Sequence, residues 1–272
     1  MVDNFALIIG IDDYTPPRES GLRTLQGAVN DANEFEKWAT DPNGGNVAAP
    51  NCKKIVSDPQ PLRPLQDEID DAFLQIQQAI QNNGGRAKRL YFYFAGHGLG
   101  ALDNIDDTAL CLANWSENRR KSALSSEAYK DVIRQYGYFE EIIFLADCCR
   151  NSKINVNGME PTFAPLASHQ FSGSTRLFVG YATTYQDESY EVEMEDSEMR
   201  GVFTKVLIDG LNGDAANDNG VVSADKLRDY LKKYTPIEAQ RHGYKQVPDV
   251  SHSFTSNIPI ITLSNVQDVA PG

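Results

Sequence analysis

The sequence predicts an α/β protein built on a mostly parallel, six-stranded sheet with helices on both faces. Three features of the 272-residue chain support this prediction. Short apolar runs rich in β-branched and aromatic residues recur along it, segments with helical spacing of apolar residues separate them, and several runs end in small or polar residues. Strands that alternate with helices specify a mostly parallel sheet, in which ligands bind at the carboxyl ends of the strands.

The first half of the chain supplies four of the predicted strands. They are expected at residues 5–11, 53–56, 89–95 and 141–146, and helices are expected at residues 25–38, 65–80 and 125–136. The second of these helices has the clearest pattern, because one helical stripe carries Ile69, Phe73, Ile76 and Ile80. Serines at the start of the third helix are typical helix caps.

The second half repeats the alternation. Strands are expected at 176–182 and 257–263, and helices at 201–211 and 223–234. Three segments are predicted to be loops because they are rich in Gly, Pro and Asn, lack a period or are strongly acidic: 41–51, 151–174 and 187–199. We expect a single domain over 1–272, with a first half at 1–150, a connecting loop at 151–175 and a second half at 176–272.

Composition limits the classes of function. The chain is 41% hydrophobic and 23% charged, which is typical of a globular protein with a substantial core. No apolar run approaches the roughly 18 residues needed to span a bilayer, and the start lacks the pattern of a signal peptide, so we expect a soluble, cytoplasmic protein. A net charge of −13 disfavours nucleic acid and anionic membranes as partners and favours basic ligands. The spacing of the four cysteines supports neither a zinc site nor a disulfide framework.

Two predicted strands end in reactive side chains. Residues 89–95 lead into a Gly-His-Gly motif centred on His97, and residues 141–146 lead into an Asp-Cys-Cys motif that ends at Cys149. If the two strands are neighbours in the sheet, an imidazole lies beside a thiol. This pair is the minimum requirement for a cysteine nucleophile with a histidine base.

The arrangement of these motifs resembles a known family. A glycine-flanked histidine after one strand, with a cysteine about 50 residues later after the next, is the arrangement of caspases. The chain resembles the caspase-like peptidases, and among them the metacaspases and their bacterial relatives. The segments that carry the resemblance span most of the sequence: FALIIGID at 5–12, LQGAVNDA at 25–32, YFAGHG at 93–98, LADCCR at 145–150 and GVFTKVLIDGL at 201–211. The resemblance implies a three-layer caspase-like fold and a cysteine-type endopeptidase.

The resemblance also implies roles for the residues at the two strand ends. Aligning the family's cysteine motif on Asp147 makes Cys149 the nucleophile and Cys148 its neighbour. His97 would take the thiol proton and later protonate the leaving amine. The backbone amides of Gly98 and Cys149 would form the oxyanion hole.

The acidic residues near the cysteine suggest a specificity. Asp147 lies two residues before Cys149, so an extended strand points both side chains to the same side. Asp31 matches the first-helix aspartate that lines the S1 pocket of metacaspases. Two carboxylates in one pocket select Arg or Lys, because a cation relieves their repulsion. The alternative is that Asp31 is a solvated helix acid and Asp147 a hydrogen-bonded residue at the strand end.

The chain departs from the family's cysteine motif at two positions. Arg150 and Asn151 occupy positions where the family usually has His and Ser, so the local loop is expected to differ.

Calcium activates many metacaspases, and it binds several carboxylate oxygens. The candidates in this sequence are Asp103, Asp106 and Asp107, for which the alternative is an ordinary solvated loop. The proposed chemistry itself requires no cofactor.

Activation and partners are further expectations. Self-processing, if it occurs, is expected in the loop after the nucleophile, at Lys153, with the basic segment 119–121 as the rival site. The expected partners are proteins or peptides with basic residues, together with a regulatory partner. Two alternatives stay open: a protease module of a bacterial defence or cell-death system under a separate sensor, and a non-catalytic interaction module. The intact His97 and Cys149 disfavour the second.

Overall fold

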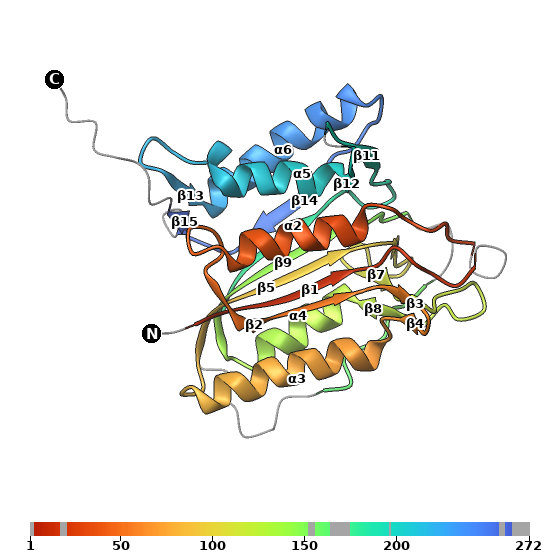
Figure 1. The fold of residues 1–272 in the computed structure, drawn as a ribbon, viewed down its shortest axis with the longest axis horizontal. Coiled ribbons are helices and arrows are strands. Elements are labelled where there is room, and N and C mark those ends of the chain that lie inside the picture. Colours follow the sequence, from red (N-terminus) through yellow and green to blue (C-terminus); the bar gives the residue numbers. More distant parts are fainter. Residues whose placement is uncertain are drawn as a thin grey trace.

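A six-stranded sheet forms the centre of the structure, a computed structural model that describes residues 3–16, 21–151, 156–163, 175–195, 197–255 and 259–262 (Figure 1). The strand order is β14-β10-β9-β5-β1-β2. Five of these strands run parallel, and β14 pairs antiparallel with β10. The bounds are β1 Asn4–Gly10, β2 Val47–Val56, β5 Ala87–Ala95, β9 Phe139–Asp147, β10 Arg176–Tyr181 and β14 Asp249–His252.

Helices cover both faces of the sheet, which gives three layers (Figure 1). One face is covered by α2 (Ala28–Thr40), α5 (Val202–Asp209) and α6 (Ala224–Arg241), and a π-helical segment η1 (Gly210–Asp214) continues α5. The other face is covered by α3 (Gln66–Asn82) and α4 (Ser126–Gln135). The predicted fold class is therefore confirmed.

Short strands extend the loops around this core. Residues near the carboxyl ends of β5 and β9 form a three-stranded sheet of β6 (Gly98–Gly100), β7 (Thr108–Cys111) and β8 (Ala123–Ser125). Three two-stranded ribbons complete the described structure: β3 (Asp58–Pro59) with β4 (Leu62–Arg63), β11 (Glu191–Glu193) with β12 (Met199–Gly201), and β13 (Val221–Ser223) with β15 (Pro259–Thr262).

The core is built from the buried apolar strands and from the close packing of α2 against β1. Strands β5 and β9 are buried along most of their length, and the rings of Phe92 and Phe144 stack between them at 4.6 Å. Gly10, at the end of β1, lets α2 pack unusually close, because a Cβ there would lie 2.6 Å from Cβ of Ala32. Helix α2 is thus held near the carboxyl end of β1.

The structure corrects several predicted boundaries. The sixth strand of the central sheet is β14, whereas the segment predicted for it contains β15, which pairs with β13. Strand β14 was missed because an edge strand of four residues with one buried side chain has no apolar run. Residues predicted as loops also include the start of β2 and the hairpin of β11 and β12.

Helix α6 is longer than predicted. It continues through Pro236 to Arg241, although proline removes a backbone donor and usually ends a helix. Its last turns bury Glu238 and Ala239, so tertiary packing outweighs the local preference. Among the described residues, no helix combines the length and apolar character required to cross a membrane.

Candidate active site

The structure brings His97 and Cys149 to one edge of the sheet. Strands β5 and β9 are parallel neighbours, with Ala95 opposite Asp147, so the imidazole and the thiol follow two adjacent strand ends. The N–H of Gly96 donates to the carbonyl oxygen of Asp147 at 3.1 Å. His97 and Cys149 both line a small pocket and a wider groove that shares several of its lining residues.

Two glycines allow the histidine loop to lie against the cysteine loop. A Cβ on Gly98 would lie 2.5 Å from Sγ of Cys148, and a Cβ on Gly100 would lie 2.5 Å from the carbonyl oxygen of Arg150. The N–H of Gly100 also donates to the carbonyl oxygen of Asn151 at 2.9 Å. Strand β6 can approach the cysteine loop this closely because neither glycine has a side chain.

The hydrogen bonds of His97 define its protonation. Its Nε2 lies 2.8 Å from the carbonyl oxygen of Arg23, which can only accept, so Nε2 carries the proton and Nδ1 is free to act as a base. Burial lowers the pKa of His97 to about 4, although the hydrogen bond to Arg23 opposes the shift. The Tyr14 ring packs 4.8 Å from the imidazole, and its hydroxyl accepts from the His97 N–H at 2.7 Å. The imidazole is therefore neutral near pH 7.

The two adjacent thiols differ in access. Cys148 is fully buried and does not line the pocket, whereas Cys149 is partly exposed and lines it. The N–H of Ser189 donates to Sγ of Cys149 at 3.3 Å. Burial raises the pKa of Cys149, and the Ser189 hydrogen bonds partly offset the rise. At rest the pair is therefore a neutral thiol with a neutral imidazole, and the proton must move when the sulfur attacks.

The two predicted acidic residues, Asp31 and Asp147, line the same pocket as His97 and Cys149. Oδ2 of Asp31 accepts from the N–H of Gly201 at 2.9 Å, and Oδ2 of Asp147 accepts from the backbone and hydroxyl of Thr204 at 3.0 and 2.8 Å. A Cβ on Gly201 would collide with both carboxylates, so this glycine lets them approach the same point. Oδ1 of Asp31 is buried and has no hydrogen-bond partner within the described part of the chain.

The closeness of these carboxylates changes their ionisation. Burial raises the pKa of Asp31 well above its ordinary value of 3.8, and the charge of Asp147 raises it further. Burial also raises the pKa of Asp147, while the hydrogen bonds from Thr204 oppose the shift. The pair therefore holds a proton more readily than two separate carboxyl groups, and a bound cation would take the place of that proton.

A third carboxylate, Glu191, was missed by sequence reasoning. It lies on β11, lines both the pocket and the groove, and accepts from the N–H of Gly27 at 2.9 Å at the start of α2. Its charge raises the pKa of both Asp31 and Asp147. The strongly acidic composition of 187–199 was the only signal for it in the sequence. We call the cavity lined by Asp31, Asp147 and Glu191 the acidic pocket.

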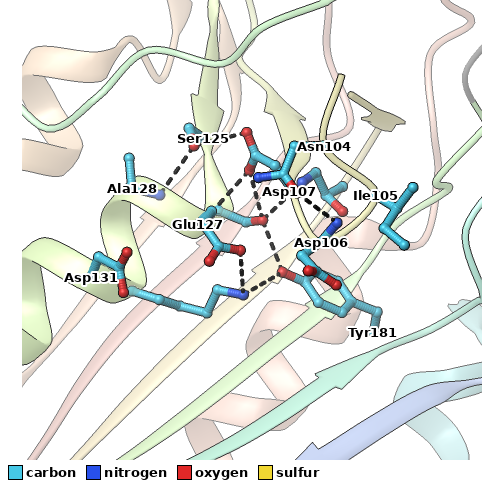
Figure 2. Close-up of polar contacts among 12 residues, drawn as sticks. Asn104, Ile105, Asp106, Asp107, Ser125, Glu127, Ala128, Asp131 and Tyr181 are labelled. Atoms are coloured by element: carbon cyan, nitrogen blue, oxygen red, sulfur yellow. Dashed lines mark hydrogen bonds and ion pairs between the residues drawn. The ribbon is translucent and has the colours of Figure 1, made fainter. Parts of the chain in front are cut away.

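The metal candidates are not brought together. Asp103 and Asp106 are exposed, whereas Asp107 is buried and caps helix α4 (Figure 2). The Asp107 carboxylate accepts three hydrogen bonds of 2.9–3.2 Å, from the side chains of Ser125 and Ser126 and the N–H of Glu127. Across the described ranges, no group of three or more His, Cys, Asp or Glu side chains is arranged to hold a metal ion. At Asp107, these capping hydrogen bonds occupy both carboxylate oxygens.

The structure describes one of the two predicted processing segments. Lys153 lies outside the described residues. The rival segment, 119–121, is an exposed turn after β7.

The fold and the site together define a caspase-like peptidase domain. The family model of the caspase domain matches residues 3–259, so the chain belongs to the caspase domain family. A probable protease of a Desulfuromonadales bacterium is 28% identical over 246 residues, which cover 86% of this chain and 28% of that protein. The chain thus spans less than a third of the length of that relative.

Solved structures show the same fold at low identity. Caspase-1 of Spodoptera frugiperda is 12% identical with a TM-score of 0.58, covering 97% of this chain and 92% of that one. A protein of Geobacter sulfurreducens is 13% identical with a TM-score of 0.56, covering 96% and 99%. At these identities the likeness extends to the fold alone.

Proposed function

We propose that this chain is a cysteine endopeptidase that cleaves peptide bonds after Arg or Lys. The proposal is carried by one observation: the same pocket is lined by His97, by Cys149 and by the buried carboxylates of Asp31 and Asp147. The caspase family membership and the protease relative support the class of reaction. The acidic pocket supports the preference for basic side chains.

The proposed reaction uses the two strand-end side chains in turn. Sγ of Cys149 bonds to the scissile carbonyl carbon while Nδ1 of His97 takes the thiol proton. The attack makes the former carbonyl oxygen negative, and the backbone N–H groups of Gly98 and Cys149 donate hydrogen bonds to it. In proteases with known sites, each such donor stabilises the transition state by about 3–4 kcal/mol. His97 then gives its proton to the leaving amine as the C–N bond breaks, and water hydrolyses the thioester. The carbonyl of Arg23 holds the imidazolium through Nε2.

The preference for basic residues follows from charge and unsatisfied hydrogen bonding. Oδ1 of Asp31 has no hydrogen-bond partner among the described residues, and a guanidinium or ammonium group in the acidic pocket would donate to it. An aspartate side chain would add a negative charge beside Asp31, Asp147 and Glu191, which is strongly unfavourable in a buried site. The carboxylate of Asp147 also caps α5, so the pocket is rigidly attached to that helix.

A matched peptide panel tests the proposal. Peptides that differ only in the residue before the cleaved bond would carry Arg, Lys, Gln or Asp, and release of a reporter would give kcat/KM with calcium and with a chelator. We expect cleavage after Arg and Lys at least about 100-fold faster than after Asp, which corresponds to roughly 2.7 kcal/mol. Faster cleavage after Asp than after Arg would contradict the proposed specificity.

A second function is favoured by the length of the relative. Since the chain spans 28% of the probable protease that it matches, it fits a protease module within a larger, regulated system. In that case a separate part of the system would control the site, and calcium would be one of the activators to test. A larger effect of a partner region than of calcium on cleavage of the same Arg peptide would support this second function.

A further inference from the structure

Arg150, the residue after Cys149, has a buried guanidinium that joins distant segments. The side chain is 2% exposed, and its guanidinium carbon lies 4.3 Å from the centroid of the Tyr181 ring. Three of its nitrogens each donate one hydrogen bond of 2.8–3.0 Å, to the Ile105 carbonyl oxygen, Oγ1 of Thr108 and Oδ2 of Asp249. One side chain therefore contacts the loop after β6, the start of β7 and strand β14.

The backbone of Arg150 is held by a different segment, the loop after β10. Its N–H donates to the carbonyl oxygen of Asp187 at 3.1 Å, and its carbonyl oxygen accepts from the N–H of Gln186 at 3.0 Å. The same loop continues to Ser189, whose N–H reaches Sγ of Cys149. Arg150 thus lies between the loop that contacts the thiol and the segments that its guanidinium holds.

The guanidinium also secures the acidic loop, residues 102–107. Asp107 fixes one point of this loop on α4, and Arg150 fixes another through the Ile105 carbonyl. The guanidinium lies over the Tyr181 ring, whose hydroxyl is 2.8 Å from Oγ of Ser126, and this Oγ in turn donates to Asp107. Tyr181 and Asp107 are labelled in Figure 2. A continuous set of contacts therefore leads from the nucleophile to the cap of α4.

We propose that Arg150 is a positioning residue of the catalytic centre, whose guanidinium fixes the backbone of Cys149 by tying it to the acidic loop and to β14. The inference rests on the proposed function, because it assigns Arg150 to the alignment of that nucleophile and its amide. A guanidinium fits the role since its planar fork donates in three directions and stacks on an aromatic ring, whereas an ammonium is a point charge. Within the described part of the chain its one carboxylate partner is Asp249, which is half-exposed, so the ion pair by itself adds little stability.

The proposal predicts which kinetic constant changes. Arg150 does not line the acidic pocket, so its loss should leave the binding of a basic side chain unchanged. Misalignment of Sγ and the Cys149 amide would act on the chemical step, where a displacement of about 1 Å can cost about 10²-fold. We therefore expect a lower kcat with a KM close to that of the unchanged protein.

Chemical rescue tests this prediction. In Arg150→Gly, the half-exposed side of Asp249 leaves a route for free guanidinium ion to enter the vacated space. We expect kcat for an Arg peptide to fall by about 10²-fold and to recover at least tenfold with guanidinium below denaturing concentrations. Arg150→Lys should recover much less. The rate of Cys149 alkylation by iodoacetamide, which requires no peptidase activity, should fall and recover in parallel.

Arg176→Gly is the matched control. Arg176 also pairs with a carboxylate, Glu141, but at the opposite end of the sheet, so its loss should lower the melting temperature without lowering kcat per folded molecule. Guanidinium should not raise activity in this variant. A folded Arg150→Gly variant with unchanged kcat, or one that guanidinium leaves unrescued, would overturn the proposal.

Two milder variants keep the test decisive if Arg150→Gly does not fold. Thr108→Val and Asp249→Asn each weaken one contact of the guanidinium, and both should lower kcat and alkylation rate without raising KM. If neither variant changes either rate, Arg150 has no positioning role. If the unchanged protein is alkylated at Cys149 but cleaves no peptide, the proposed function fails, and the alkylation rates alone decide the role of Arg150.

Discussion

Asp147 combines a structural and a chemical role at one position. It ends β9, caps α5 through Thr204 and contributes a carboxylate to the acidic pocket, two residues before Cys149. The hydrogen-bonded strand end considered from the sequence is therefore observed, and the same carboxylate lines the pocket, so its binding of a basic side chain stays a prediction. Its neighbour Cys148 is buried, so the alternation along the chain places only one of the two thiols at the cavity.

We expect this difference between the thiols to appear in activity. Cys149→Ala should lower cleavage of an Arg peptide by at least about 10³-fold, since a missing nucleophile removes the covalent step. Cys148→Ala should keep most of the activity and lose about 1–2 kcal/mol of stability, because it leaves a small cavity. Labelling by an electrophilic inhibitor followed by peptide mapping provides the check, and a label on Cys148 with none on Cys149 would show that the register is wrong.

The pH dependence should separate the carboxylates from the histidine. The raised pKa of the Asp31 and Asp147 pair means that a proton competes with a basic side chain at pH values above the ordinary 3.8. As pH rises through that range the proton leaves, so KM for an Arg peptide should fall. The pKa of His97, about 4, keeps its base form available until lower pH, so kcat should stay nearly constant over the same interval.

Kinetics from pH 4 to pH 8 with Arg and Gln peptides would check this separation. The Gln peptide provides the control, because its neutral side chain does not compete with a proton in the same way. A kcat that falls steeply between pH 7 and pH 5 while KM stays constant would contradict the assignment and point to an imidazole with an ordinary pKa.

At the scale of elements, the acidic pocket forms where helix starts converge on strand ends. Asp31 lies in the first turn of α2, Glu191 caps the start of that helix from β11, and Asp147 caps the start of α5. The positive ends of two helices therefore stabilise part of the negative charge before any substrate binds. The predicted starts of these two helices differ from the observed starts by only a few residues. The hairpin of β11 and β12 was not predicted, because its segment has no periodic pattern of apolar residues.

Gly201 has no room for a side chain beside the two carboxylates. Gly201→Ala would put a methyl group against both carboxylates, so it should separate them or displace the start of α5. We expect KM for an Arg peptide to rise by about tenfold and stability to fall by about 1–3 kcal/mol. Gly213→Ala, away from the pocket but in the left-handed region, is the control: it should lower stability and leave KM unchanged.

At the scale of the whole molecule, the site is assembled from both halves of the chain. The imidazole and thiol come from the first half, whereas Ser189, Glu191 and the α5 start come from the second. A cut in the connection between the halves could free the loops around the nucleophile, provided that it spares residues 156–163, where Val156 and Phe163 are buried in the core. This is the physical reason to expect an activating cut after Cys149.

We predict that any self-processing requires Cys149 and occurs at a basic residue in the connection, with Lys153 favoured over the exposed turn at 119–121. Intact-mass and peptide mass spectrometry of the purified protein would locate the cut. Lys153→Gln should remove it, while Arg120→Gln should have no effect. Full peptidase activity in an uncut chain, or the same cut in Cys149→Ala, would show that self-cleavage is not the activating step.

The sequence by itself determined the parallel sheet, the strand ends at which His97 and Cys149 lie and, through family resemblance, the two aspartates of the pocket. These features depend on local apolar runs and on motifs, which are written along the chain. Only the tertiary structure decided that Glu191 joins the pocket, that Asp107 caps α4, and that β14 forms an edge of the sheet. Such contacts join positions as far apart as the 170 residues between Asp31 and Gly201, and they exist only once the chain has folded.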